Sequence, residues 1–536
     1  MSIEYFVEGK VITKVKGDYS VFSKEDITHN TGISLEQSGK ENGVSYGKAK
    51  NIDPNNKPVN LLEVSLNLFF DGTQNNKTNS DLGKDYKESN HDDDSYTNDY
   101  SNIARGYDAV DPAAENQVSY YIEGIGTEDG KGEMHLFGNV PNKGILFGTG
   151  SRGVIAKVLK GCIKGAEALK KYAGKDIHLK VNVFGFSRGA TAARHFLHIS
   201  NTSAKVVENK FGIYALSPQH QDSLIDAVRI KAHTPLTDKH GYFGACLAYW
   251  EVIPQKITFN FAGLYDTVAS YGSEHRPKEI GGIPIIPGDT EQLGLTAIKE
   301  AHFTLQITAD DEFRDNFDLT NIDSCGVKGL QFILPGVHSD IGGCYVNKNE
   351  EKVDLYEEEG SGEKCLEFRR IIIEEGWYKP EEIFIERLSP HRNGVDARHI
   401  LKGIRKPYNT YDKISFNAMF HYSQGCGVKY DNDLAGRHKI TDPFLLEIRD
   451  QLLHYMNACT LLRNTYIEEY NRSNDSGDYL TQLNALHYES FVDLEKLKIL
   501  RNQYLHWSAS ATKIGYGPRI GKVTSGKERT RNIQNG

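Results

Sequence analysis

Apolar and polar residues alternate along 62–70, and this period of two predicts a β-strand that buries one face. A similar alternation at 177–183 predicts a second strand, and the apolar-rich segments 257–261 and 330–334 predict two more. Apolar residues at helical spacing occupy 154–169, and another helix is expected shortly after the second strand. Strands that alternate with helices indicate a mostly parallel sheet flanked by helices, so the fold class is predicted to be α/β.

Changes in composition divide the chain into a core, two insertions and flanking parts. A polar, β-like N-terminal segment with a linker covers 1–58, and the α/β core covers 59–345 with an insertion at about 205–255. A second insertion, a lid or a membrane-facing region, covers 346–435. C-terminal helices that pack on the core cover 436–515, and a basic, solvated tail covers 516–536. The core is the part in which chemistry is expected, because parallel sheets place ligands at the carboxyl ends of their strands.

Charge and cysteine content narrow the possible partners. The 536 residues contain 63 Lys and Arg against 72 Asp and Glu, a net charge of −9, which argues against nucleic acid because such binding neutralises phosphates. The seven cysteines are scattered without a C-x-x-C pair, so we expect reduced thiols, no zinc site and no disulfide framework. No window approaches ~18 uncharged apolar residues, so no membrane span is expected. The N-terminus lacks a basic start before an apolar stretch, so no signal peptide is expected either.

The pentapeptide Gly185-Phe186-Ser187-Arg188-Gly189 matches the G-x-S-x-G nucleophile elbow, and it lies between a predicted strand and a predicted helix. In such an elbow a sharp turn lifts the serine hydroxyl clear of the sheet. The N-terminus of the following helix favours the negative charge that develops during ester hydrolysis. We therefore predict Ser187 as a nucleophile. The predicted fold becomes an α/β-hydrolase-like sheet with insertions and a short β-rich N-terminal segment.

A serine nucleophile needs an acid and a histidine base, which follow it in that order in this fold. Asp266 ends the strand predicted at 257–261, and His338 follows the strand predicted at 330–334 in a glycine-rich loop. Both side chains should therefore meet Ser187 at the carboxyl edge of the sheet.

Other acids and another histidine also follow Ser187 in the order serine, acid, histidine. Asp310 and Asp311 also lie between the serine and the predicted histidine, but they follow a stretch at 295–304 that looks helical. His506 also follows the predicted acid, but its aromatic neighbours are typical of a packed helix. A loop at the end of a strand positions an imidazole over the elbow more readily than a helix interior does, so Asp266 is predicted as the acid and the strand-end histidine as the base.

The oxyanion hole is expected to combine the backbone amide of Arg188 with that of Gly72 or Thr73, in the loop after the first strand. Asp71 adjoins this loop and Asp340 adjoins the histidine, and both are predicted to support the site. Asp340 is equally well explained as a turn former.

The elbow is one of several separated segments that can be compared with known families. They read FFDGT at 69–73, GFSRGA at 185–190, GLYDTV at 263–268, GVHSDIGG at 336–343 and LRNQYLHWS at 500–508. Together they resemble the type VI secretion lipase effector family, and the last is similar to that family's closing helix. The resemblance covers roughly 60–345 and 440–515, and it does not extend to 1–58.

The resemblance implies an antibacterial phospholipase, a serine esterase that hydrolyses acyl esters of membrane phospholipids without a metal or other cofactor. It also implies three partners: a phospholipid membrane surface, a spike or tube component of a contractile injection machine, and a cognate immunity protein. Such a protein is made in the bacterial cytoplasm and secreted into a target cell without a signal peptide. We expect the insertions at 205–255 and 346–435 to cover the Ser187 cleft, with Trp250 or Trp377 near its mouth.

Three alternatives remain open. An esterase or thioesterase acting on small soluble esters would use the same triad. A metal-assisted phosphatase or nuclease would use Asp71 and the acidic run at 91–94, because hard cations prefer oxygen ligands, although no recognised metal-binding spacing accompanies these acids. A binding module with a decayed site would not need the intact set of serine, acid and histidine.

Overall fold

The computed structural model describes most of the chain from residue 61 onward. Described in full are 61–89, 94–133, 151–232, 234–269, 289–388, 397–472, 476–512, 516–519 and 529–536, and only the backbone is described at 135–137, 140–141, 278–280, 283–286 and 473. All of these residues belong to one compact unit, Leu61–Gly536. The predicted N-terminal segment, 1–58, lies outside the described residues.

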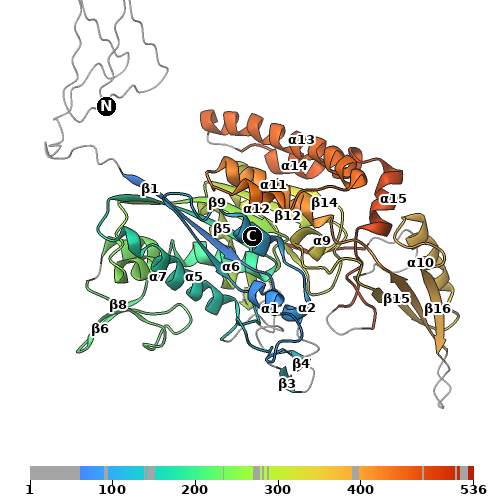
Figure 1. Ribbon diagram of the computed structural model, residues 1–536, viewed down its shortest axis with the longest axis horizontal. Coiled ribbons are helices and arrows are strands. Elements are labelled where there is room, and N and C mark those ends of the chain that lie inside the picture. Colours follow the sequence, from blue (N-terminus) through green and yellow to red (C-terminus); the bar gives the residue numbers. More distant parts are fainter. Residues whose placement is uncertain are drawn as a thin grey trace, which may run out of the picture. The chain divides into compact units, whose positions relative to one another are not determined.

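Six parallel strands form the central sheet (Figure 1). In spatial order they are β14 (Gly329–Leu334), β12 (Phe303–Ala309), β9 (Lys256–Tyr265), β5 (Ile177–Phe186), β1 (Leu62–Phe70) and β2 (Gln117–Ile122). Every neighbouring pair runs parallel. The predicted parallel α/β sheet is thus confirmed, and the carboxyl ends of all six strands lie along one edge.

Helices cover both faces of this sheet. One face packs against α5 (Val154–Ala168), α6 (Arg188–Ile199) and α7 (Pro235–Tyr249), and the other against α3 (Asn102–Ala109), α11 (Asp412–Gly425) and α13 (Pro443–Ser473). In β1, Leu66, Leu68 and Phe70 point into the first layer, whereas Phe69 points into the second. Burying each such side chain contributes about 1.5–3 kcal/mol, and strands covered on both faces therefore carry many apolar residues.

The hydrophobic pattern misses two strands of the central sheet, β2 and β12. The stretch at 295–304, which looks helical in sequence, is a short 3-10 helix, Leu295–Glu300, that ends before β12 begins. Strand β12 escapes the pattern because it buries Gln306, whose side chain donates to Thr320 O and Gln331 Oε1. Asp310 and Asp311 therefore also follow a strand, so strand position alone does not distinguish them from Asp266.

The insertion at 205–255 lies away from the predicted cleft. It forms an antiparallel sheet of β6 (Val206–Asn209), β7 (Gly212–Ala215) and β8 (Val228–Ile230), followed by α7. A backbone bond from Gln255 N to Ile177 O attaches its end to the start of β5. Trp250 therefore lies near the amino end of that strand, about 30 Å of strand length from Ser187. The expectation that Trp250 lines the cleft mouth is wrong.

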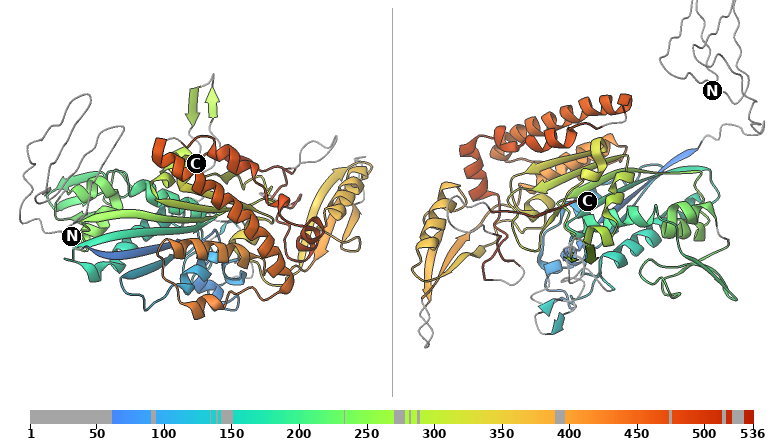
Figure 2. Two further views of the ribbon diagram at one scale, coloured as in Figure 1. Left: turned by 90° about the horizontal axis from the view of Figure 1, so that it is seen from above. Right: turned by 180° about the vertical axis from the view of Figure 1, so that it is seen from behind.

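The insertion at 346–435 contributes both a separate module and the core helix α11. In the module, α10 (Glu363–Glu374) packs on an antiparallel sheet of β15 (Glu351–Glu359), β17 (Arg398–Arg405) and β16 (Ile383–Leu388), and the whole stands at one end of the unit (Figure 2). Trp377 is 1% exposed and packs edge-to-face on Trp507, with 5.3 Å between ring centroids. Its place is in the apolar core, so the expectation that it lies at a cleft mouth is also wrong.

Three helices of the region 436–515 cover the β14 side of the sheet: α13, α14 (Tyr479–Ala485) and α15 (Leu494–Gln503). In the first of these, Leu445, Ile448 and Leu452 are fully buried, whereas Leu453 is 39% exposed. Among the described residues, no helix is both long and apolar enough to cross a bilayer.

The last described segment is not a solvated tail. Strand β18 (Ile533–Gln534) pairs in parallel with β13 (Leu319–Thr320), and Arg531 is buried against Asp266. A basic segment is expected to be exposed to solvent when no acidic residues lie near it in the sequence. For residues 529–536 that expectation is wrong, because the fold supplies a buried carboxylate.

Candidate active site

Ser187 occupies a strained turn between β5 and α6. Its backbone has φ 57° and ψ −128°, a conformation that costs a non-glycine residue about 1–3 kcal/mol. The glycines two positions before and after it leave no room for a side chain. A Cβ on Gly185 would lie 2.4 Å from Ala190 Cα, and one on Gly189 would lie 2.3 Å from Asp71 O. Ser187 therefore sits in an elbow of the shape that the motif predicts.

Asp266 and His338 come together at the same edge of the sheet. Asp266 follows β9, and its Oδ2 lies 2.5 Å from Nδ1 of His338, the first residue of α9 (His338–Gly342). The two residues are buried, with exposures of 0% and 4%. The imidazole lies against the ring of Phe186 at 4.6 Å between centroids, which places it beside the residue that precedes Ser187. Ser187 N also donates to Tyr265 O at 3.0 Å, which joins the elbow to the Asp266 strand.

The rival acids are engaged elsewhere. Asp310 accepts a hydrogen bond from Tyr488 OH at 2.9 Å, and Asp311 accepts one from Gly336 N at 2.7 Å. Both side chains therefore tie the sheet edge to neighbouring segments, whereas Asp266 holds the imidazole.

His506, the rival base, has a carboxylate partner of its own. Its Nδ1 lies 2.7 Å from Asp340 Oδ1, and its backbone N donates to Asp340 Oδ2 at 2.9 Å. Asp340 Oδ2 also accepts from Val337 N at 3.0 Å at the start of α9, the helix that His338 begins. Asp340 thus forms the turn and supports the histidine loop at the same time.

Sequence reasoning misses three buried charged residues near this histidine: Glu312, Arg314 and Arg531. Glu312 Oε2 accepts from His338 N at 3.2 Å, and Arg314 binds the same carboxylate through Nε and Nη2 at 2.9 and 2.8 Å. Arg531 binds Asp266 through Nη1 and Nη2 at 2.7 and 2.8 Å. The Glu-Phe-Arg alternation after β12 is a weak sequence signal for the first two, whereas no motif marks Arg531.

The protonation states suit a general base. Burial would raise the pKa of Asp266, but Arg531 and the hydrogen bond with His338 outweigh it and hold that pKa well below its ordinary value. Burial would also raise the pKa of Glu312, yet Arg314 lowers it to about 2. Burial lowers the pKa of His338, and the Asp266 carboxylate opposes this only in part. At neutral pH both acids are therefore ionised and the imidazole is neutral.

Asp71 holds the loop after β1. Its buried carboxylate accepts from Gly72 N at 2.7 Å, from Ser101 Oγ at 2.6 Å and from Tyr121 OH at 2.6 Å. Burial raises its pKa to about 6 despite these donors. Its oxygens are thus occupied by the protein itself, which argues against the metal-site alternative.

No set of three His, Cys, Asp or Glu side chains in the described part of the chain is arranged to hold a metal ion. Residues 91–93 of the acidic run lie outside the described residues.

The side chain of Arg188 joins the β1 loop to the elbow. Its Nε donates to Thr73 Oγ1 at 2.8 Å, a contact that sequence reasoning does not anticipate because only the backbone amide of Arg188 has an expected role. Gly72 lies against Phe186, since a Cβ on this glycine would come within 2.5 Å of the phenyl ring. The predicted oxyanion residues Gly72, Thr73 and Arg188 are thus brought together.

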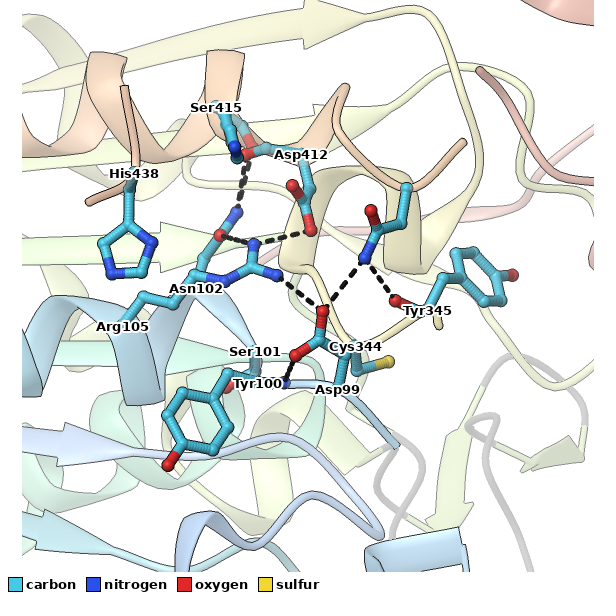
Figure 3. A network of polar contacts seen from close by, with 12 residues as sticks. Asp99, Tyr100, Ser101, Asn102, Arg105, Cys344, Tyr345, Asp412, Ser415 and His438 are labelled. Atoms are coloured by element: carbon cyan, nitrogen blue, oxygen red, sulfur yellow. Dashed lines mark hydrogen bonds and ion pairs between the residues drawn. The ribbon is translucent and has the colours of Figure 1, made fainter. Parts of the chain in front are cut away.

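Figure 3 shows a polar network in which side chains at the start of α3, such as Asn102 and Arg105, meet Asp412 and Ser415 of α11. Ser101, which binds Asp71, caps α3, and the next residue, Asn102, donates through Nδ2 to Ile341 O of α9 at 2.9 Å. Arg105 Nη1 forms a buried ion pair with Asp412 Oδ2 of α11 at 2.6 Å. Helices α3 and α11 therefore fix the β1 loop and α9 relative to each other.

Comparison with known proteins places this site in a family. The family model described as "T6SS, Phospholipase effector Tle1-like, catalytic domain" matches residues 65–360, more than half of the 536-residue chain. Among solved structures, the chain is similar to one titled "Structure of the Tle1 effector bound to the VgrG spike from the Type 6 secretion system", with a TM-score of 0.50, 20% identity, and coverage of 90% of this chain and 89% of that one.

A second similar structure is an uncharacterized protein from Pseudomonas aeruginosa, with 15% identity, a TM-score of 0.33, and coverage of 75% of this chain and 51% of that one. No curated protein matches the chain. The likeness to the Tle1 structure agrees with the α/β-hydrolase-type fold, and the family match confirms the resemblance found in the separated sequence segments. The chain therefore belongs to the Tle1-like phospholipase effectors of the type VI secretion system, and it is a lipolytic hydrolase.

Proposed function

We propose that the chain is a serine esterase that cleaves the acyl esters of membrane phospholipids, with Ser187, Asp266 and His338 as its catalytic triad. The observation that carries the proposal is the 2.5 Å contact between Asp266 Oδ2 and His338 Nδ1, next to the Ser187 elbow. With Nδ1 paired in this way, Nε2 is the nitrogen that exchanges protons with the serine and the leaving group.

In the acylation step, Ser187 Oγ attacks the ester carbonyl carbon while His338 Nε2 takes the hydroxyl proton. The bond between the acyl carbon and the glycerol oxygen then breaks, and the imidazolium gives its proton to the departing lysophospholipid alcohol. Asp266 stabilises the imidazolium between these two transfers. Water attacks the acyl-serine by the same proton path and releases the fatty acid.

The oxyanion of each tetrahedral intermediate requires donors that are already in place. One is the backbone amide of Arg188, at the start of α6, where the first amides have no partner within the helix. The other comes from the β1 loop. Because the Gly72 amide already donates to Asp71 Oδ1, we assign this second role to the Thr73 amide.

We also propose the biological setting. The chain is made in a bacterial cytoplasm, is carried into a target cell by the secretion machine and meets a phospholipid bilayer there, and its partners are a spike or tube component and a cognate immunity protein. The similar solved structure, described as the Tle1 effector bound to the VgrG spike, supports a spike partner. Co-purification of the tagged chain with the spike protein of its own secretion system tests this part.

Product analysis on defined vesicles tests the reaction. With phosphatidylethanolamine and phosphatidylglycerol vesicles, the wild type should release fatty acid and lysophospholipid, and Ser187→Ala should lower the rate by about a million-fold. Ser200→Ala, at the other end of α6, is the matched control and should retain full activity, because Ser200 Oγ has no hydrogen-bond partner within the described part of the chain. Substantial turnover by Ser187→Ala, or release of the headgroup instead of the acyl chain, would overturn the proposal.

A further inference from the structure

The segment 529–536 lies in the active-site region although it is far from the triad in sequence. It runs beside the loop that follows β12, where β18 pairs with β13. Leu319 N donates to Asn532 O at 2.9 Å, and Asn321 N donates to Gln534 O at 3.0 Å. These backbone bonds fix the course of the segment and therefore the position from which the Arg531 side chain reaches inward.

Arg531 makes a two-pronged contact with the proposed catalytic acid. Its Nη1 donates to Asp266 Oδ1 at 2.7 Å and its Nη2 donates to Oδ2 at 2.8 Å. Its Nε donates to Phe317 O at 2.6 Å, and the Phe317 ring packs edge-to-face on His338 with 5.0 Å between centroids. The Arg531 side chain is 8% exposed and that of Asp266 is fully buried. A guanidinium fork of this kind fixes the plane of a carboxylate as well as its charge.

The chemistry of the pair explains what such a contact can do. A buried carboxylate without a cation would tend to take up a proton, and a protonated acid could not stabilise the imidazolium. We propose that Arg531 is a positioning residue for the triad: it keeps Asp266 ionised and in the plane that meets His338 Nδ1, and it thereby sets the pH range in which His338 acts as a base. This inference rests on the proposed triad.

The charged groups that face the imidazole come from several elements. Asp266 and Glu312 are anionic, and Arg314 and Arg531 are cationic. Arg314 is paired with Glu312, so Arg531 is the cation that binds the carboxylate of the triad. Without the positive charge of Arg531, the two carboxylates near the imidazole face one guanidinium instead of two. The Asp266–His338 pair then takes up a proton at higher pH, on the carboxylate or on the imidazole, and either protonation removes the ionised acid and neutral base that the reaction needs.

Arg531→Gln tests the inference, with Arg529→Gln as its matched control. Arg529 lies in the same segment, but it pairs with Glu375 and lies near Phe313 and Trp507 instead of the triad. Arg531→Gln should lower kcat/KM about 10- to 100-fold, the size expected when a charge-assisted hydrogen bond to a carboxylate is lost. It should also move the acid limb of the pH profile to higher pH. Arg529→Gln should change neither.

Two further variants separate positioning from folding. Arg531→Lys keeps the charge but not the fork, so it should restore the acid limb while only partly restoring the rate. In an Asp266→Asn background, Arg531→Gln should cause little additional loss, because a residue that acts through Asp266 has nothing left to act on. Thermal unfolding shows whether each variant is folded.

Equal effects of Arg531→Gln and Arg529→Gln, an unmoved acid limb, or full additivity with Asp266→Asn would each overturn the inference. Its failure is distinct from failure of the triad. If Ser187→Ala is inactive while Arg531→Gln behaves as wild type, only the role of Arg531 is overturned. If Ser187→Ala remains active, the triad itself is overturned.

Discussion

Two buried histidine–aspartate pairs adjoin α9, and they differ more in their surroundings than in their own geometry. Nδ1 of His338 lies 2.5 Å from Asp266 Oδ2, and Nδ1 of His506 lies 2.7 Å from Asp340 Oδ1. The second aspartate uses its other oxygen to accept from the backbone amides of Val337 and His506. It therefore fastens a late segment of the chain to the start of α9.

The first pair belongs to the proposed triad. The His338 ring lies beside Phe186, next to the strained Ser187, and Arg531 binds both oxygens of Asp266. The His506 ring instead stacks on Tyr345 at 3.8 Å between centroids. A histidine–carboxylate contact is therefore no signature of catalysis by itself. What distinguishes the first pair is its position beside the serine in the elbow turn.

The largest difference in turnover is expected between variants that lack one or the other histidine. His338→Ala should lower turnover by about a million-fold, because the base of a triad is about as important as its nucleophile. His506→Ala should leave turnover per folded molecule near that of the wild type and destabilise the fold by about 1–3 kcal/mol, since buried hydrogen bonds are lost. Ester hydrolysis assays together with thermal unfolding measure both. Loss of turnover in folded His506→Ala but not in His338→Ala would reverse the assignment.

The pH dependence of kcat/KM sharpens the same comparison. Burial lowers the pKa of His338, so the acid midpoint should lie below ~6.5, the ordinary value for histidine. A protonated imidazole cannot accept the serine proton, so activity is present above that midpoint and lost as the pH falls through it. His506→Gln should leave the midpoint unchanged. A midpoint that moves with His506→Gln would show that the wrong pair has been assigned.

The smallest expected effect on the rate comes from the loop after β1, which lies beside the elbow and therefore near the first pair. Thr73→Val removes the hydroxyl that accepts from Arg188 Nε, and kcat should fall about 3- to 10-fold, the size expected for one hydrogen bond. Thr73→Ser keeps the acceptor and is the control. Equal rates for the two variants would mean that the contact between the loop and the elbow does not assist the reaction.

Local periodicity could predict much of the fold. The alternation at 62–70 and the helical spacing at 154–169 agree with β1 and α5 because both elements bury apolar faces. Strand β12 could not be found in this way, since its buried Gln306 interrupts the apolar pattern. The place of Trp377 also depends on a distant partner, Trp507, and no local pattern indicates that the two side chains meet.

The residues of the candidate site also fall into two groups, those that a local sequence pattern indicates and those that only the fold brings together. Ser187, Asp266 and His338 each follow a strand within a recognisable segment, so sequence reasoning could select them. Arg531 could not be selected, because it is 265 positions away from Asp266 and only the fold brings the two together. Glu312 is similar: its sequence neighbours suggest a charged loop, whereas the fold buries its carboxylate against the amide of His338.

The most direct test of the central claim is covalent labelling of the nucleophile with a fluorophosphonate, followed by peptide mapping. The reagent modifies a serine that an adjacent base activates. We predict one adduct per molecule, located on Ser187, which forms at the wild-type rate in His506→Ala and far more slowly in His338→Ala. An adduct on another serine, or labelling of Ser187 that does not depend on His338, would contradict the account.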